Sequence, residues 1–324
     1  MLPPKESLTI CFAHVAYRLQ ERFLARQTGI ASFEVRSAED LARRIGEADV
    51  LAVSGLWRSA LLESAHRLRF IQSVSAGIDQ FDRPLLAARG IRLASAQGVN
   101  ERAVAEHAMA LILALMRRLP EARDNQARRH WRGMARRLEG REDELGGKTL
   151  LIIGLGRIGG RLARLAKAFD LRVLGIRRDP AAGGNGADAV HGPDRLGELL
   201  AAADFVALTC PLTPETRGII DAGALRRMKP TAYLVNVARG RCVEEAALVE
   251  ALTQGRIAGA ALDCFAEEPL PPSSPLWAFG NVLITPHSAG ETKRYEDNVL
   301  DVLEQNLERL WSGASQLVNE ILAA

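Results

Sequence analysis

The chain has 324 residues, which at about 150 residues per domain is enough for two domains that each bury a core. Apolar residues make up 48% and charged residues 25% of the sequence, which excludes fibrous and low-complexity proteins and favours an ordinary soluble globular protein. The net charge of +3 gives no overall reason to expect a nucleic-acid or membrane partner.

The cysteines and the N-terminus favour a cytoplasmic protein. The four cysteines are far apart in the sequence and form no C-x-x-C pair, so no metal-binding cluster and no disulfide framework is predicted. The first residues lack the basic-then-apolar pattern of a signal peptide. The longest apolar run, Ala108 to Met116, is much shorter than the about 20 residues of a membrane span. We therefore expect reduced thiols and no membrane partner.

The N-terminal hundred residues have the pattern of an α/β domain. Short runs rich in Val, Ile and Leu alternate with stretches of helical period, which is typical of βαβ units around a parallel sheet. Strands are predicted near residues 8–13, 33–36, 49–54, 69–74 and 91–94, with helices such as 39–48 and 58–68 between them. This indicates a compact domain of flavodoxin-like size.

A long helix and an arginine-rich stretch follow. Residues 99–118 are apolar on nearly all helical faces, which predicts a buried helix at a domain junction or between subunits. Residues 117–141 contain nine Arg and three acidic residues, a net charge of +6, so the rest of the chain has a net charge of −3. Only Trp131 offers an aromatic platform there, so we favour a solvated helical surface over a nucleic-acid partner.

A second βα series occupies the rest of the chain. Strands are predicted at 148–153, 171–176, 204–209, 231–237, 257–263 and 281–285. The last 35 residues are predicted to form a long amphipathic helix, with 316–324 as a short return segment. The whole chain is therefore assigned to the α/β class.

A glycine motif in the second series indicates dinucleotide binding. The strand at 148–153 leads into G-x-G-x-x-G and then a helix. Gly154 permits the tight turn, Gly156 lets the backbone approach a pyrophosphate, and Gly159 lets the helix pack closely on the strand. The helix N-terminus offers free N–H groups to the phosphates. A merely tight βα turn is the alternative, which the flanking strand and helix disfavour.

The end of the next strand bears on the choice of dinucleotide. NAD sites commonly place an acidic residue there, but this chain has Arg177 and Arg178. Two guanidinium groups suit the 2′-phosphate of NADPH, so we predict NADPH over NADH. In the alternative interpretation both arginines are solvated surface residues, and Asp179 binds the ribose of NADH.

Three groups at later strand ends predict oxo-acid chemistry. Arg239, Glu268 and His287 each follow a predicted strand, and ligands of open α/β sheets bind at the carboxyl ends of strands. Arg239 suits a substrate carboxylate, and His287 suits proton donation to an oxygen as hydride arrives at carbon. Glu268 would favour the charged imidazole. Any one of these residues taken alone is more often structural. The prediction of catalysis depends on all three following strands of the same series in this order.

Taken together, these motifs resemble those of the D-isomer-specific 2-hydroxyacid dehydrogenases, and the resemblance extends over essentially the whole chain. The resemblance rests on segments 154–159, 211–216, 236–240, 259–269 and 285–287. It implies that Arg239 binds the substrate carboxylate, that Glu268 is the acidic partner and that His287 is the acid/base. It also implies cofactor contacts from Arg157, Ile158, Cys210, Pro211, Thr216, Val237 and Asp263, and substrate contacts from Ser75, Ala76 and Gly77.

The resemblance also implies a particular fold and assembly. A Rossmann-like dinucleotide-binding domain (100–286) would be inserted into a flavodoxin-like substrate domain (1–99 with 287–324), both with doubly wound parallel sheets. The helix near 101–118 would help to form a homodimer. Cys264 stands where the family usually has an aliphatic residue, and we interpret it as a small buried hydrophobe.

The leading hypothesis is NADPH-dependent reduction of a small 2-oxo acid, such as glyoxylate or hydroxypyruvate, to the D-2-hydroxy acid. One alternative is NAD-dependent oxidation of a phosphorylated or larger 2-hydroxy acid. A second alternative, from a different class, is a dinucleotide-sensing binding protein without turnover. No metal is expected at the site.

Overall fold

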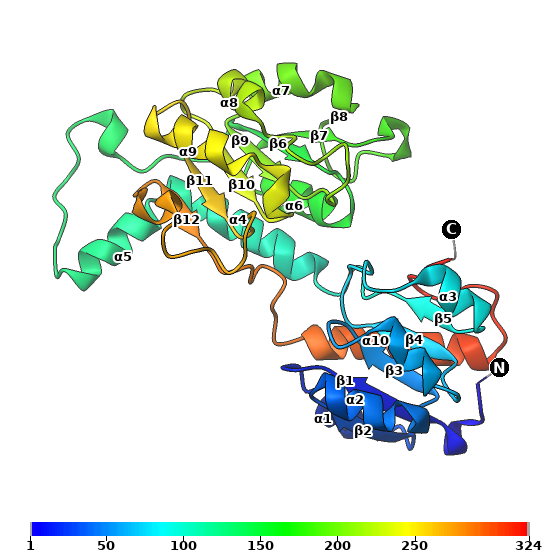
Figure 1. The fold of residues 1–324 in the computed structure, drawn as a ribbon. Coiled ribbons are helices and arrows are strands. Elements are labelled where there is room, and N and C mark those ends of the chain that lie inside the picture. The colour runs from blue at the N-terminus through cyan, green and yellow to red at the C-terminus, as the bar shows by residue number, and fades with distance from the viewer. Residues whose placement is uncertain (1, 323–324) are drawn as a thin grey trace. The chain divides into compact units, whose positions relative to one another are not determined.

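The computed structural model describes residues 2–322 and divides into two compact units (Figure 1). Unit 1 combines the chain up to Asn100 with the chain from Thr292 onward, and unit 2 comprises Glu101–Glu291. Unit 1 is thus built from both ends of the chain. The division places His287 in unit 2, whereas the sequence led us to expect the C-terminal part of unit 1 to begin there.

Unit 1 contains a five-stranded, fully parallel sheet in the order β2-β1-β3-β4-β5. This is the strand order of flavodoxin-like folds. The strands are β1 (Thr9–Ala13), β2 (Ala31–Val35), β3 (Val50–Val53), β4 (Phe70–Ser73) and β5 (Arg92–Ala94). Successive residues of β1 alternate between two cores, because Ile10 and Phe12 belong to one apolar cluster and Cys11 and Ala13 to the other.

Helices cover both faces of this sheet. They are α1 (Leu19–Ala25), α2 (Ala38–Arg44), α3 (Arg83–Ala88) and α10 (Tyr295–Trp311). The chain after α10 returns to the sheet, where Glu320 forms an antiparallel bridge with Ala94 and an ion pair of 2.7 Å with Arg92. The predicted return segment is therefore present within the described residues.

The predicted helix at 58–68 is wrong. Only Ser59–Glu63 is helical, as a 3-10 helix, and a turn follows. Leu62 in this helix and Ala65 and Leu68 in the turn that follows are buried, so the segment packs on the sheet without being an α-helix. Beyond them, the Arg69 N–H donates to the Asp49 carbonyl and begins the pairing of β4 with β3.

Unit 2 contains a seven-stranded, fully parallel sheet in the order β12-β11-β10-β9-β6-β7-β8. The chain moves outward from β6 in one direction and then returns to the other side of β6 as β9, so the strand order reverses between β6 and β9. The strands are β6 (Thr149–Ile153), β7 (Arg172–Ile176), β8 (Ala189–His191), β9 (Phe205–Leu208), β10 (Tyr233–Asn236), β11 (Gly259–Leu262) and β12 (Val282–Ile284).

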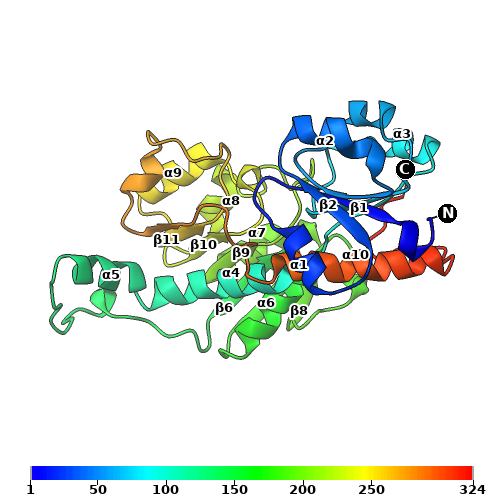
Figure 2. The same cartoon turned by 90° about the horizontal axis from the view of Figure 1, so that it is seen from below.

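Two layers of helices cover the sheet of unit 2. The covering helices are α4 (Glu101–Met116), α6 (Arg157–Lys167), α7 (Leu196–Ala202), α8 (Ala222–Arg227) and α9 (Glu245–Thr253), while α5 (Leu119–Ala127) follows α4 outside these layers. Figure 2 shows α4 and α6 on one side of the sheet, where they share a core with Leu150 and Ile152. Leu151 and Ile153 point to the other core, under α7, α8 and α9. The predicted burial of the long helix is confirmed, since Ala105, Ala108 and Ile112 are inaccessible to solvent.

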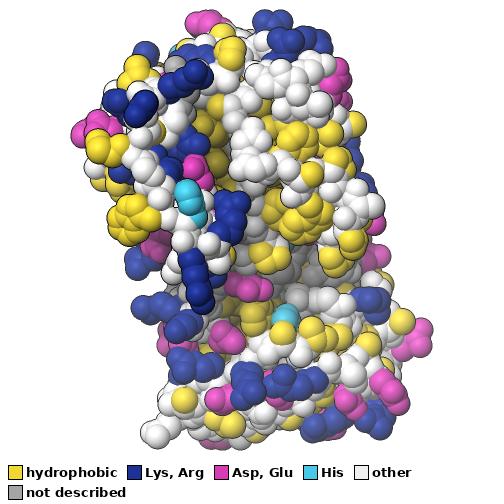
Figure 3. All heavy atoms as spheres, turned by 90° about the vertical axis from the view of Figure 1, so that its left-hand side faces the viewer, with side chains coloured by type: hydrophobic (Ala, Val, Ile, Leu, Met, Phe, Trp, Pro, Cys, Tyr) yellow, Lys and Arg dark blue, Asp and Glu magenta, His cyan; other side chains and the backbone are white. Residues whose placement is uncertain are grey.

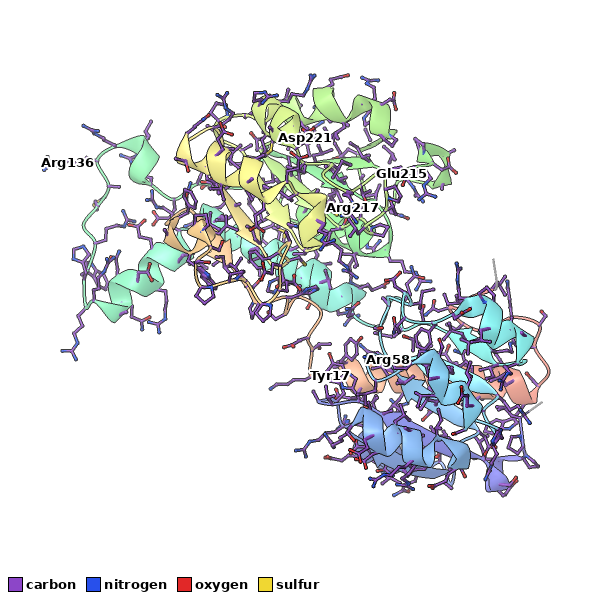
Figure 4. The ribbon with its side chains drawn as sticks, viewed as in Figure 1. Tyr17, Arg58, Arg136, Glu215, Arg217 and Asp221 are labelled. Atoms are coloured by element: carbon purple, nitrogen blue, oxygen red, sulfur yellow. The ribbon has the colours of Figure 1, made fainter. Side chains whose placement is uncertain are left out.

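The arginine-rich stretch forms an arm, which we define as residues 117–147. It begins with α5, continues as irregular chain with one 3-10 turn at Leu138–Gly140, and extends away from the sheet of unit 2 (Figure 1). Arg136 points outward from the arm (Figure 4), and basic side chains are exposed on the face drawn in Figure 3. Trp131 and Met134 are 94% and 99% exposed. The arm therefore presents both apolar and basic groups to solvent.

No helix within residues 2–322 combines the length and the apolar character that crossing a membrane requires.

Candidate active site

The glycine motif forms a tight turn at the point where the strand order of unit 2 reverses. Gly154 follows β6 with φ +102°, and a Cβ atom added there would lie 2.5 Å from the backbone N of Cys210. A Cβ atom on Gly159 would lie 2.5 Å from the Gly154 carbonyl oxygen. Both positions therefore require glycine, the first because β6 and the chain after β9 meet there, the second because α6 packs on the turn.

The space beside Gly156 fits the backbone of a dinucleotide. Gly156 is the N-cap of α6, and a Cβ atom added there would meet no described atom within 4 Å. The N-terminus of α6 therefore faces open space, with Arg157 exposed in its first turn. Free N–H groups, the helix dipole and a basic side chain together suit a pyrophosphate.

Arg177 is half-buried at the end of β7 and is engaged with the loop that follows. Its Nη1 donates to the carbonyl oxygens of Ala182 and Gly183 at 3.1 and 2.8 Å. Arg178 is exposed. Asp179 turns back on its own loop, because its Oδ1 accepts a hydrogen bond of 3.0 Å from the Ala181 N–H. Guanidinium groups thus occupy the strand end where an acidic residue is usual.

The loop after β9 carries three further predicted cofactor contacts, Cys210, Pro211 and Thr216, while Val237 and Asp263 directly follow β10 and β11. The Thr216 hydroxyl donates to the Pro211 carbonyl at 2.6 Å and accepts from the Thr213 N–H at 2.7 Å. Cys210 begins this loop, and its neighbouring thiol lowers the pKa of Cys242. Figure 4 labels Glu215 and Arg217 on the same loop.

The loop that carries Arg239 is held by Asn236 at the end of β10. The buried Asn236 side chain accepts from the Ala238 N–H at 3.0 Å and donates to the Arg239 carbonyl at 3.1 Å. A Cβ atom on Gly240 would lie only 1.9 Å from the Phe265 carbonyl carbon, so Gly240 lets this loop touch the loop after β11. Arg239 itself is exposed.

Glu268 and His287 form a hydrogen-bonded pair. The His287 Nδ1 lies 2.7 Å from the Glu268 Oε2, and the Glu268 Oε1 accepts a 2.9 Å hydrogen bond from the Phe265 N–H. Their side chains are 44% and 36% exposed. Because Nδ1 faces Glu268, Nε2 is the ring nitrogen left to donate a proton. The structure thus brings two of the three predicted catalytic side chains into direct contact, with Arg239 on the adjoining loop.

Asp263 fixes the segment on which His287 lies. This carboxylate is 1% exposed and accepts hydrogen bonds from the Thr285 hydroxyl, the Ser288 N–H and the Ala289 N–H at 2.6, 2.9 and 3.0 Å. His287 adopts φ +52°, in the left-handed region that costs a non-glycine residue conformational energy. Asp263 holds the backbone after this residue through Ser288 and Ala289, and it holds the Thr285 side chain before it.

The sequence interpretation missed His107 and Thr285. The His107 Nε2 on α4 lies 3.0 Å from the Thr285 Oγ1 and 3.6 Å from the Asp263 Oδ1, so it joins the same network. The available signal was a single imidazole in a helix that is apolar from Ala108 to Met116. That signal is weak, because such a histidine is usually part of a core.

The predicted substrate loop lies in unit 1, directly after β4. The Ser75 hydroxyl donates to the Gly77 carbonyl at 2.8 Å, and the Ser73 hydroxyl donates to the Ser75 carbonyl at 2.9 Å. Among residues 2–322, no group accepts a hydrogen bond from the N–H of Ala76 or Gly77. The loop is therefore shaped so that two neighbouring backbone donors remain available.

The two sheet orders and the glycine turn define a two-unit α/β protein with a dinucleotide-type turn in unit 2. Residues 109–289, more than half of the chain, match the family described as D-isomer specific 2-hydroxyacid dehydrogenase, NAD binding domain. The chain belongs to the D-isomer-specific 2-hydroxyacid dehydrogenase family, whose members are NAD(P)-dependent oxidoreductases. The predicted family and fold class are confirmed.

Individual relatives carry two different activities. The glyoxylate reductase of Thermofilum pendens is 38% identical over 84% of this chain and 80% of its own length. The D-3-phosphoglycerate dehydrogenase of Methanocaldococcus jannaschii is 37% identical over 87% of this chain and 53% of its own length, so this chain spans about half of that relative.

A solved structure is similar over nearly the whole chain. The NADPH-dependent glyoxylate/hydroxypyruvate reductase of Sinorhizobium meliloti, in complex with NADP and malonate, has a TM-score of 0.77 and 28% identity over 97% of each chain.

Proposed function

We propose that this protein reduces a small 2-oxo acid, such as glyoxylate or hydroxypyruvate, to the D-2-hydroxy acid with NADPH. The observation that carries the proposal is the 2.7 Å contact between His287 and Glu268, next to the loop of Arg239. Reduction of a 2-oxo acid needs a cation that binds the carboxylate and an acid that protonates the carbonyl oxygen. The exposed guanidinium and the neighbouring acid–base pair can supply these two groups. The names of the glyoxylate reductase relatives support the substrate class.

In the proposed mechanism, three side chains act on the substrate. Arg239 binds the carboxylate in a bidentate manner and polarises the neighbouring carbonyl. The nicotinamide of NADPH supplies a hydride to C2 when it is bound. The His287 Nε2 donates a proton to the carbonyl oxygen, while Glu268 stabilises the imidazolium through Nδ1. The free N–H groups of Ala76 and Gly77, with Ser75 shaping their loop, are proposed to bind the other side of the carboxylate.

Unit 2 is the proposed dinucleotide-binding domain and unit 1 the proposed substrate domain. The glycine turn and Arg157 would hold the pyrophosphate, with Ile158 beside it on α6. Proposed contacts to the rest of the cofactor come from Cys210, Pro211, Thr216, Val237 and Asp263. The open space beside Gly156 and the exposed Arg157 support this assignment.

NADPH is the proposed cofactor because Arg177 and Arg178 occupy the end of β7. Two cations there favour a 2′-phosphate and are poor partners for the ribose hydroxyls of NADH. The Sinorhizobium meliloti reductase, which is described with NADP, supports this choice. Use of NADH is the alternative, with Asp179 as the ribose partner.

A second candidate function is NAD-dependent oxidation of a phosphorylated or larger 2-hydroxy acid. The 37% identity to a D-3-phosphoglycerate dehydrogenase favours it. The third candidate, a dinucleotide-sensing binding protein, would keep cofactor affinity without turnover.

A homodimer in the cytoplasm is the proposed state of the protein. Trp131 and Met134 on the arm are almost fully exposed, and large apolar side chains at the end of an extended arm suit a subunit interface. All four cysteines are free thiols, as a reducing compartment requires. A molar mass from light scattering that matches one chain would contradict the dimer.

A spectrophotometric panel tests the function. NADPH and NADH oxidation are followed with glyoxylate, hydroxypyruvate and longer 2-oxo acids, and D-3-phosphoglycerate is tested with NAD in the oxidative direction. The proposal expects the highest kcat/KM for a small oxo acid with NADPH. Higher kcat/KM for D-3-phosphoglycerate would favour the second candidate, and cofactor binding without any turnover would favour the third.

A further inference from the structure

Cys264 lies beside the acid–base pair, although the reaction does not use it. The Cys264 Sγ, a carboxylate oxygen of Glu268 and a ring nitrogen of His287 all lie within 4.8 Å of one another. Cys264 is 3% exposed, whereas the other two side chains are partly open to solvent. Three different donor types therefore converge on one point at the edge of the proposed active site.

These donors match the chemistry of zinc. Thiolate, imidazole and carboxylate are the usual protein ligands of Zn²⁺, and a thiolate is a poor ligand for Mg²⁺ or Ca²⁺. Zinc bonds of about 2.0–2.3 Å in a tetrahedral site place the ligand atoms roughly 3.5 Å apart. The His287 Nδ1 and the Glu268 Oε2, 2.7 Å apart, would separate to admit the ion, and the Cys264 Sγ lies within 4.8 Å of both groups. The partly exposed side chains of Glu268 and His287 have room for this adjustment.

The backbone around the three donors is fixed on two sides. Asp263 binds the Ser288 and Ala289 N–H groups and so anchors the segment of His287. The Cys264 Sγ donates a 3.5 Å hydrogen bond to the Ala238 carbonyl, which fixes the thiol against the Arg239 loop. A ligand set held by a prearranged backbone loses little conformational entropy when it binds a metal.

We propose that Cys264, Glu268 and His287 form a Zn²⁺ site whose occupation inhibits the enzyme. A zinc ion bound there occupies a ring nitrogen of His287 and the carboxylate of Glu268. The proposed proton transfer needs both groups, so proton donation to the substrate stops. Three protein ligands leave a fourth position for water or for the substrate's own oxygens. The sequence led us to expect no metal here, because the three residues are not adjacent in the chain and Cys264 resembles a core residue.

Zinc binding at this site releases the thiol proton. A cysteine binds zinc as the thiolate, so the metal displaces the thiol proton when it binds. Zinc bound there acts as a reversible inhibitor.

The test compares wild-type protein with Cys264→Val and Cys264→Ala. Zn²⁺ binding is measured by equilibrium dialysis, and Co²⁺ serves as a spectroscopic probe whose thiolate charge-transfer band reports a sulfur ligand. Cys11→Ala is the matched control, because Cys11 is also a buried thiol and lies in unit 1. The wild type and Cys11→Ala should bind one Zn²⁺ per chain and show the cobalt–thiolate band.

Both Cys264 variants should lose the band and bind zinc at least about tenfold more weakly. The proposal is overturned if they bind zinc as tightly as the wild type, or if cobalt binds the wild type without a sulfur band. The inhibition rests on the proposed function, and both Cys264 variants should keep activity in zinc-free buffer but resist added zinc. Because binding is read without turnover, a failure of the oxo-acid panel leaves the metal result interpretable.

Discussion

The imidazole of His287 is held by Glu268 through a 2.7 Å hydrogen bond at Nδ1, and Glu268 is itself held by the Phe265 N–H at 2.9 Å. This chain of two hydrogen bonds connects the loop after β11 with the segment after β12. The proton donor of the proposed reaction is therefore oriented by a carboxylate whose own position is fixed by backbone.

His287→Ala should lower kcat by about 10²–10⁴, the usual contribution of a general acid. Glu268→Gln should lower kcat less, because an amide keeps the shape but stabilises the imidazolium poorly. NADPH affinity, measured by fluorescence titration, should stay unchanged in both variants. Glu267→Gln is the matched control, since this neighbouring carboxylate is exposed. Loss of NADPH binding in His287→Ala would instead assign His287 a structural role.

Arg239→Ala should raise KM steeply and also lower kcat, because the guanidinium both binds and orients the substrate. Arg239→Lys keeps the charge but not the bidentate geometry, so it should recover part of the loss in KM. Steady-state kinetics with glyoxylate measures both values. An Arg239→Ala variant with near wild-type kcat/KM would remove this residue from the active site.

Gly240→Ala should separate the two loops that carry Arg239 and Glu268. The added Cβ would lie 1.9 Å from the Phe265 carbonyl carbon, so backbone must shift, at a cost of about 1–3 kcal/mol in the free energy of unfolding. The kcat/KM of the variant should fall by more than the loss of folded protein accounts for. Gly280→Ala is the control, because its Cβ would meet no described atom within 4 Å. Equal activity in both variants would show that the loop contact has no catalytic role.

Arg177→Asp should move the cofactor preference toward NADH. A carboxylate there would repel the 2′-phosphate and accept hydrogen bonds from the ribose hydroxyls. The ratio of kcat/KM for NADPH and NADH measures the effect. Arg172→Asp, at the opposite end of β7, should leave that ratio unchanged. The phosphate contact is wrong if Arg177→Asp also leaves it unchanged.

Glu320→Gln should destabilise unit 1 in a pH-dependent way. Burial pushes the pKa of Glu320 up, but hydrogen bonds from Arg92 and the Leu317 N–H outweigh it, so the pKa is lowered overall. A lowered pKa stabilises the fold above the unfolded value of about 4.3, and this stabilisation disappears as the pH falls through the folded value.

The free energy of unfolding, from urea titration, should therefore differ between wild type and Glu320→Gln by about 1–3 kcal/mol at pH 7. The difference should vanish in acid, below the folded pKa of Glu320. The exposed Glu308 provides the control variant Glu308→Gln, which should match the wild type at both pH values. A difference that persists in acid would exclude the carboxylate charge as its cause.

The features that the sequence predicted well are local in the chain. Gly154 and Gly159 stand next to a buried strand, and their positions follow from a motif in which each glycine has a steric task. Glu268 and His287 were predicted as partners from residue type and strand-end position, without any knowledge of their contact. Elements with a strong apolar period, such as α4, were likewise predictable.

The features that were missed depend on tertiary contacts. The segment after Ser59 has helical composition, but Arg69 is drawn into β4 by the Asp49 carbonyl. Strand β8 has only three residues, too few for a periodic pattern. His107 gains a role only because α4 passes Thr285, more than 170 residues later in the chain. The convergence of Cys264 with the acid–base pair has the same origin.

In the proposed reaction, hydride passes from NADPH to C2 of a small 2-oxo acid while His287 protonates the oxygen. The most direct test follows hydroxypyruvate reduction with NADPH that carries deuterium at the transferred position, and analyses the product by mass spectrometry and chiral chromatography. We expect D-glycerate with one deuterium at C2, formed by His287→Ala at least about 100-fold more slowly than by the wild type. Unlabelled product, the L isomer, or no turnover by the wild-type protein would contradict it.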